Sequence, residues 1–336
     1  MIVLAHIREF PLNSVLNTYI PGFTVLCSVV VSGFYVLAGF LACKGWMQAA
    51  QPSQYIRRYV LWLGRIYGLF CLLQFFTDPL SAVRTGSFAH RSLQYYFEPF
   101  LIIGPYRPLW FIPPMILAVI LGYWAERRRW LATLGAFTLI GFLLAACVIG
   151  PLQVVARQIM GDLSVYHYKH WKLLEILIFN YLGYGLPYIF AGICIAKQEK
   201  LFVSLNKWHL TVPTLLWSAI ELTLLRSLYP QGYSGLMLFA HLPLTILLFY
   251  GLLSIHNTWV QPYHSYLRRL SIFLFLVHWP LIHFNAWLLG NPLALLSPGR
   301  TALCIGLTFS QILLLERLFV WLQQKRKQNR AVALNA

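Results

Sequence analysis

The sequence predicts an all-α, polytopic integral membrane helical bundle with about ten transmembrane helices, the first of them truncated. Three observations support this fold class. Of the 336 residues, 59% are hydrophobic and only 10% are charged, and the mean hydropathy is +0.65. The apolar residues gather into long runs, and basic residues cluster between the runs. Soluble domains carry roughly a quarter of their residues as charges, so the composition excludes an ordinary soluble enzyme.

Nine apolar runs approach the length of about 20 residues that a membrane-crossing helix needs. Residues Met1–Ile7 resemble the end of a tenth span. We expect one membrane domain over residues 1–323 and a basic cytoplasmic tail over residues 324–336. The nine runs are Phe23–Cys43, Tyr59–Phe76, Pro108–Ala125, Trp130–Gly150, Leu173–Ala196, Trp208–Leu228, Ser234–Ile255, Leu270–Leu289 and Thr301–Gln323.

The basic residues predict the orientation of these spans. Of the 26 Lys and Arg, 15 fall in one set of alternate connections or in the C-terminal tail, and seven fall in the opposite set. Cytoplasmic loops carry the excess of Lys and Arg in membrane proteins, so the C-terminus is predicted to be cytoplasmic. This topology accounts for the net charge of +17, and we expect no nucleic-acid partner.

Charged and ionisable residues inside the spans are candidates for function because burying them in lipid is costly. Arg65 lies inside a span, seven residues and thus about two helical turns after Arg58. Two guanidinium groups on one face could bind a phosphate-rich donor or reach the headgroups. Glu221, Arg226 and the Glu316–Arg317 pair are expected to pair with other helices.

Histidine is the natural general base near neutral pH. His6 ends the truncated first span, whereas His241, His278 and His283 lie in or near later spans. A single intramembrane histidine is more often a hydrogen-bonded packing element than a base.

The sequence lacks the motifs of several common enzyme classes. It has no Walker A loop, no GxGxxG after a strand, no GxSxG and no HExxH. The six cysteines are scattered singly, as expected of packing residues, and we expect no metal and no bound cofactor. His167 and His170 have a metal-like spacing, but the sequence offers no third ligand nearby.

Five segments, in order along the chain, resemble motifs of acyltransferase family 3, the polytopic membrane enzymes that commonly O-acetylate cell-surface glycans. They resemble, respectively, the end of the first helix with its essential histidine, the FFVLSGFL signature, the arginine-rich entry to the third helix, the HLWFL motif and the penultimate helix. The segments are VLAHI (Val3–Ile7), SGFYVLAGFLA (Ser32–Ala42), YIRRYVLWLGRIYG (Tyr55–Gly68), RPLWFIPPMIL (Arg107–Leu117) and RRLSIFLFLVHWPLI (Arg268–Ile282).

The resemblance implies roles for five residues. His6 is expected to be the base for the acceptor hydroxyl. Arg65 matches the second arginine of the family's RxxR pair, and Arg58 substitutes for the first; together they are expected to bind the phosphates of acyl-CoA. Trp110 and His278 are expected to line the central cavity, with Trp110 chiefly a packing residue.

The function implied by the resemblance is transfer of an acyl group, most plausibly acetyl, from cytosolic acyl-CoA to a hydroxyl of an envelope polysaccharide or glycolipid. Acyl-CoA is then a co-substrate, and membrane lipids and the glycan acceptor are the partners. A bacterial inner membrane is the expected location, and the oligomeric state stays open. Two alternatives remain: a transporter or flippase for a lipid-linked glycan, and an inactive truncated homologue.

Overall fold

The computed structural model describes residues 23–84, 110–160, 174–229, 237–254, 261–289 and 298–335. His6 and the other residues of Met1–Ile7, the predicted end of a first span, therefore lie outside the described residues. The chain divides into two compact units. Unit 1 comprises Met1–Cys27 with His256–Ala336, and unit 2 comprises Ser28–Ile255.

The described residues form helices and connections without strands, which confirms the all-α prediction. Each of the nine predicted runs falls largely on helix. The helices are α3 (Phe23–Gln48), α4 (Pro52–Arg84), α6 (Ile112–Arg127), α7 (Leu131–Val148), α8 (Gln153–Met160), the π-helix η5 (Ile178–Gly185), α10 (Leu186–Lys197), α11 (Glu199–Ser204), α12 (Lys207–Leu228), α13 (His241–Leu253), the 3₁₀ turn η6 (Gln261–Tyr263), α14 (His264–Leu288) and α15 (Pro298–Asn335).

Four helical segments are long and apolar enough to cross a membrane, and α13 is a shorter apolar helix. Their outer faces carry large exposed apolar side chains, such as Ile140 on α7 at 65% and Leu314 on α15 at 68%. Water would not tolerate so much exposed apolar surface, whereas lipid does. The chain is therefore a multi-pass membrane protein. The four segments are Val29–Gln48, Leu131–Val148, Leu174–Lys197 and Gly299–Lys325.

In unit 2, two glycines allow α3 and α10 to cross at backbone distance. A Cβ added at Gly192 would collide with the carbonyl oxygen of Val36 and lie 2.8 Å from the backbone nitrogen of Phe40. A Cβ added at Gly39 would collide with the backbone of Ile189. Small residues bring helices together in membranes because helix association there depends on van der Waals contact.

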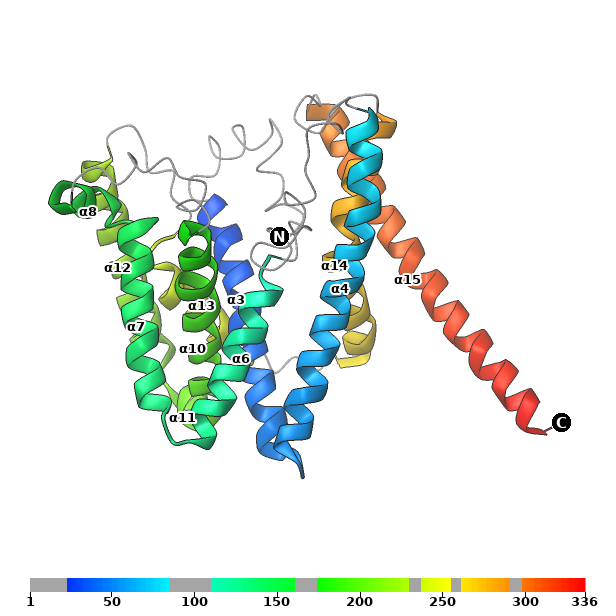
Figure 1. Cartoon of the computed structure of the whole chain (residues 1–336), viewed down its shortest axis with the longest axis horizontal. Coiled ribbons are helices and arrows are strands. Elements are labelled where there is room, and N and C mark those ends of the chain that lie inside the picture. Colours follow the sequence, from blue (N-terminus) through cyan, green and yellow to red (C-terminus); the bar gives the residue numbers. More distant parts are fainter. Residues whose placement is uncertain are drawn as a thin grey trace. The chain divides into compact units, whose positions relative to one another are not determined.

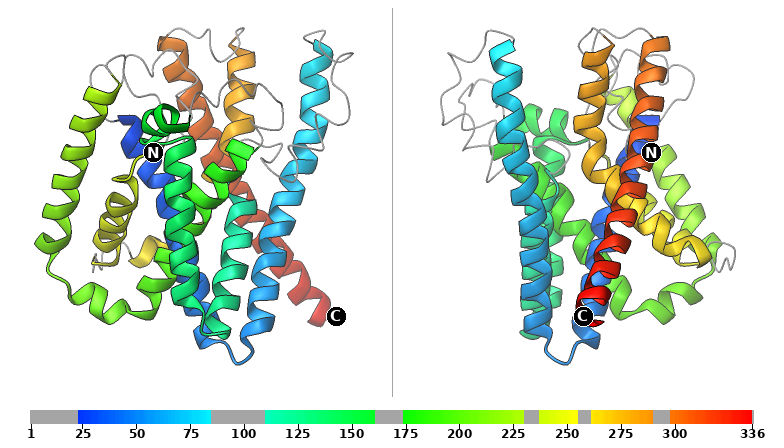
Figure 2. Two further views of the ribbon diagram at one scale, coloured as in Figure 1. Left: turned by 60° about the vertical axis from the view of Figure 1, so that its left-hand side comes forward. Right: turned by 90° about the vertical axis from the view of Figure 1, so that its right-hand side faces the viewer.

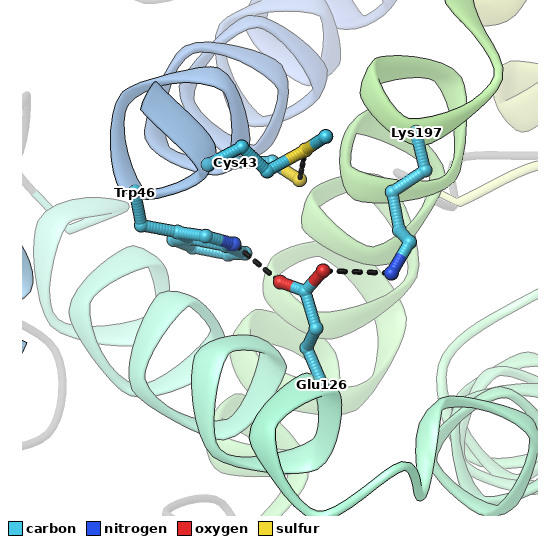
Figure 3. Close-up of polar contacts among 5 residues, drawn as sticks. Cys43, Trp46, Glu126 and Lys197 are labelled. Carbon is cyan, nitrogen blue, oxygen red and sulfur yellow. Dashed lines mark hydrogen bonds and ion pairs between the residues drawn. The ribbon is translucent and has the colours of Figure 1, made fainter. Parts of the chain in front are cut away.

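An ionic cluster joins the ends of three helices of unit 2 (Figure 3). The Glu126 carboxylate, at the end of α6, accepts a hydrogen bond from the Trp46 indole on α3. Its other oxygen lies 2.6 Å from Nζ of Lys197, at the end of α10. A second ion pair joins Lys44, two residues before Trp46, to Glu199, two residues after Lys197. All these residues stand where the positive-inside pattern places the cytoplasmic ends of the spans.

In unit 1, α14 and α15 pack side by side and antiparallel (Figures 1 and 2). Asn285 and Gln311 exchange two hydrogen bonds between their side-chain amides, of 2.9 and 3.0 Å. Nearer the other end of the pair, Nε of Arg269 donates to Glu316 at 2.9 Å. Glu316 therefore pairs across helices, as predicted from its position inside a span.

We predict that Gly192→Ala lowers the stability of the fold by about 1–3 kcal/mol, because the new methyl group must push α3 and α10 apart. Gly64→Ala in α4 is the matched control, since no atom lies within 4 Å of the added Cβ. The measurement is the unfolding midpoint of the detergent-solubilised protein, followed by circular dichroism. Equal midpoints for the two variants would contradict the close crossing.

Candidate functional site

The two predicted donor-binding arginines lie on the same face of α4. Seven residues separate them, so they lie within about 20° of each other around the helix axis. Ile56 and Leu63, also seven residues apart, are buried on the opposite face, whereas both guanidinium-bearing residues, Arg58 and Arg65, are exposed. The helix thus uses one face for packing in unit 2 and presents two positive charges on the other.

A cluster of aromatic rings surrounds Trp110, just before α6. The Trp110 ring lies 6.4 Å from Tyr35 on α3, 6.3 Å from Phe179 and 6.0 Å from Tyr184, measured between ring centroids. Phe179 and Tyr184 both belong to η5. We call these four residues, together with His241, the Trp110 cluster. Trp110 therefore packs against two elements of unit 2, α3 and η5.

Buried polar atoms distinguish the Trp110 cluster from ordinary apolar packing. The Tyr184 hydroxyl lies 3.4 Å from Nδ1 of His241. Nε2 of His241 and the hydroxyl of Tyr35 are buried, and neither has a hydrogen-bond partner in the part of the chain that the structure describes. Unsatisfied buried polar groups are costly and rare in native proteins, so they call for a functional explanation.

Glu221 fixes the position of His241. Both carboxylate oxygens of Glu221, on α12, accept backbone hydrogen bonds, from Phe239 at 2.7 Å and from Ala240 at 2.6 Å. These two N–H groups immediately precede α13, which begins at His241. A carboxylate at a helix N-terminus satisfies N–H groups that have no partner within the helix. Glu221 thus pairs with another helix, as the sequence predicted, and does so through the backbone N–H groups at the start of α13.

The π-helix η5 places Tyr184 in the cluster. Pro187 follows directly in the first turn of α10 and has no backbone N–H to donate. The backbone N–H of Leu186 bonds to Tyr181, five residues earlier, in the π-helical pattern. Asn180 and Tyr184 are both buried in this segment. Short π-helical turns are frequent at functional sites.

The structure brings some of the predicted residues together and leaves others apart. Arg58 and Arg65 share a face of α4, and Trp110 lies in the cluster. His278 is fully buried in α14 and belongs to unit 1. His6, His167 and His170 lie outside the described residues. The roles proposed for these residues stay predictions.

Sequence reasoning missed the functional potential of Tyr35 and treated His241 as a packing residue. Tyr35 lies within the SGFYVLAGFLA segment, so the motif pointed to the right stretch but not to the hydroxyl. His241 is the first residue of an apolar helix that contains Pro243. Among the described residues no group of three His, Cys, Asp or Glu side chains is arranged to hold a metal ion.

The fold and this site define a multi-pass helical membrane protein with an exposed pair of arginines and a buried aromatic cluster carrying polar groups. A family model described as "Acyltransferase domain" matches residues 1–316, so the chain belongs to acyltransferase family 3 and is a membrane acyltransferase. No curated protein and no solved structure gives a significant match.

We predict that His241→Phe lowers acyl transfer by at least about tenfold while leaving the unfolding midpoint unchanged or higher. Replacing a buried imidazole that has an unsatisfied nitrogen with an apolar ring removes a desolvation cost. The measurement combines an acyl-transfer assay in membranes with thermal unfolding of the purified variant.

Thr138→Val is the matched control for His241→Phe. The Thr138 hydroxyl, on α7, is also buried without a partner among the described residues, but it lies outside the Trp110 cluster. This variant should keep full activity. Full activity of His241→Phe, or an equal loss in both variants, would reduce His241 to a packing residue.

Proposed function

We propose that the chain transfers an acetyl group from cytosolic acetyl-CoA to a hydroxyl of an envelope polysaccharide or glycolipid, in a bacterial inner membrane with the C-terminus in the cytoplasm. The observation that carries this proposal is the family match over residues 1–316. The acetyl donor and the glycan acceptor come from what the family commonly does.

The arginine pair on α4 supports a phosphate-rich donor. Arg58 and Arg65 lie in the first half of α4, which begins shortly after Lys44 and the end of α3 at Gln48. The positive-inside pattern places this end in the cytoplasm, where acyl-CoA is found. Guanidinium groups bind phosphate oxygens through paired hydrogen bonds. The exposed face of α4 thus suits the diphosphate and phosphate groups of coenzyme A.

The chemistry needs one group that accepts a proton and later returns it. In this proposal the imidazole of His6 takes the proton of the acceptor hydroxyl as its oxygen attacks the thioester carbonyl carbon. The tetrahedral intermediate collapses with cleavage of the C–S bond. The departing thiolate of coenzyme A then takes the proton from the imidazolium, which restores neutral His6.

The Trp110 cluster fits a role on the acceptor side of this reaction. The rings of Trp110 and Tyr184 offer stacking surfaces of the kind that bind sugars, and the hydroxyl of Tyr35 and Nε2 of His241 offer hydrogen bonds. His241 begins α13, and Arg268 and Arg269 lie near the start of α14, the next α-helix along the chain. The orientation we predict therefore places His241 toward the outer half of the membrane, where an envelope acceptor would arrive.

The test is transfer of labelled acetyl from acetyl-CoA to envelope glycans in membranes containing the protein or its variants at equal expression. We predict that His6→Ala abolishes the transfer. Arg65→Gln should raise the KM for acetyl-CoA about ten- to a hundredfold, because a hydrogen bond between charged groups contributes about 1.5–3 kcal/mol.

Arg57→Gln is the control for the donor site, since it removes the same charge from the next position on the same helix but from a face about 100° away. Its KM should stay close to that of the unmodified protein. Acetyl transfer by the native protein and by His6→Ala alike would exclude His6 as the base. Movement of a lipid-linked glycan across the membrane without any acyl transfer would favour the transporter instead.

A further inference from the structure

A groove lies between α14 and α15 of unit 1, and none of the residues that line it has a catalytic or donor role in the proposed function. Its volume is about 280 Å³. Figures 1 and 2 show α15 continuing beyond the start of α14, so the groove lies where the two helices part. It is lined by Tyr266, Arg269, Glu316, Arg317, Val320, Trp321 and Gln324.

The groove carries net positive charge. Glu316 is almost completely buried, with a side chain 3% exposed, and it pairs with Arg269, whose side chain is 34% exposed. The carboxylate is thus neutralised at the inner wall, and the arginine extends outward. Arg317 is exposed, and no ion pair to it is found within the described residues. Lys325 adds a further charge next to the lining residue Gln324, with its Nζ 5.1 Å from the ring centroid of Trp321.

The position of the groove along α15 matches the depth of lipid headgroups. The apolar segment Gly299–Lys325 ends in the basic run Lys325–Lys327. Arg317 precedes Lys325 by eight residues, or about 12 Å of helix, and its long side chain can reach toward the interface. Trp321, 53% exposed, lies between them. Tryptophan beside Lys and Arg is typical of a membrane–water interface.

The same face of α15 also offers a surface for acyl chains. Leu314, Arg317, Leu318 and Trp321 follow one another at three- and four-residue spacing, so they form a single stripe along the helix. Leu314 is 68% exposed and Leu318 is 50% exposed. A ligand seated in the groove therefore meets positive charge at Arg317, with apolar surface beside it at Leu318 and about one helical turn deeper in the membrane at Leu314.

We propose that this groove binds the phosphate of an anionic phospholipid from the cytoplasmic leaflet. Arg317 holds the phosphate, with Arg269 and Gln324 at its sides, and the acyl chains lie along Leu314 and Leu318. A soluble phosphate compound would use the same cations, but it would gain nothing from the apolar stripe. Basic grooves between helices on the cytoplasmic side are a recurrent mode of lipid-headgroup binding.

The test uses the full-length protein, delipidated in detergent and titrated with phosphatidylglycerol or with phosphatidylcholine of the same acyl chains. Bound lipid is counted by native mass spectrometry. We expect phosphatidylglycerol to bind more tightly than phosphatidylcholine. Arg317→Gln should weaken phosphatidylglycerol binding about fivefold, since one basic residue near an anionic surface contributes about 1 kcal/mol. Arg317→Lys, which keeps the charge, should restore most of the binding.

Arg128→Gln is the matched control. Arg128 is also an arginine at a predicted cytoplasmic helix end, 5.9 Å from the ring centroid of Trp124, but it belongs to unit 2. The Arg128→Gln variant should bind phosphatidylglycerol as tightly as the unmodified protein does. Equal losses for Arg128→Gln and Arg317→Gln would overturn the proposal in favour of general charge attraction. Equal binding of the two lipids would overturn it as well.

Two further experiments distinguish a lipid site from a site for soluble phosphates and from a loss of stability. Inorganic phosphate and coenzyme A at millimolar concentration should leave the bound phosphatidylglycerol in place. Displacement by either would overturn the lipid assignment and make the groove a site for soluble phosphates. If Arg317→Gln lowers the unfolding midpoint, Trp321→Leu takes its place; this variant keeps every charge and should weaken binding, and unchanged binding would again count against the groove.

Discussion

The arrangement of unit 2 depends on the backbone contact between α3 and α10. Gly39 and Gly192 have no side chain at the crossing point, so each places its backbone directly against the backbone of the other helix. The contact sets the separation of two helices whose neighbouring turns carry Tyr35 on one side and Tyr188 on the other, both fully buried. Apolar side chains gain little free energy when they move from lipid into a contact between helices. Such a close van der Waals fit is therefore a principal source of helix association in a membrane.

A second set of contacts consists of hydrogen bonds and ion pairs to glutamate carboxylates. Glu126, Glu221 and Glu316 are each held by two or more hydrogen bonds or by an ion pair. Glu126 connects the ends of α3, α6 and α10, Glu221 connects α12 to the start of α13, and Glu316 connects α15 to α14. Against this background the unsatisfied atoms of Tyr35 and His241 stand out. They lie in a cluster that combines bulky rings with unused hydrogen-bonding capacity, which is why we propose the acceptor side of the reaction for it.

The apolar runs predicted the helices well, because the length and composition of a membrane-crossing helix are read directly from sequence. The ends of the runs are not the ends of the helices. The run Thr301–Gln323 agrees closely with the candidate span Gly299–Lys325, but α15 continues to Asn335, since a helix need not end where its lipid-facing stretch does. The seven-residue spacing of Arg58 and Arg65 correctly predicted a shared face. The partners of Glu126, which are 80 and 71 residues away in sequence, could not be predicted, because no local pattern encodes contacts between distant helices.

The π-helical turn η5 has a consequence for how this chain can vary. Its wider hydrogen-bonded loops accommodate one residue more than the same length of α-helix would hold. Deleting a single residue there would let the turn close to ordinary α-helix, so α10 would keep nearly its present rotation. A deletion within α10 itself would instead rotate the residues beyond it by about 100°. Gly192 would therefore still meet α3 after a deletion in η5, but the wide turn that carries Tyr184 into the Trp110 cluster would be lost. The segment can thus lose one residue without disturbing the crossing of α3 and α10, but not without changing the position of Tyr184.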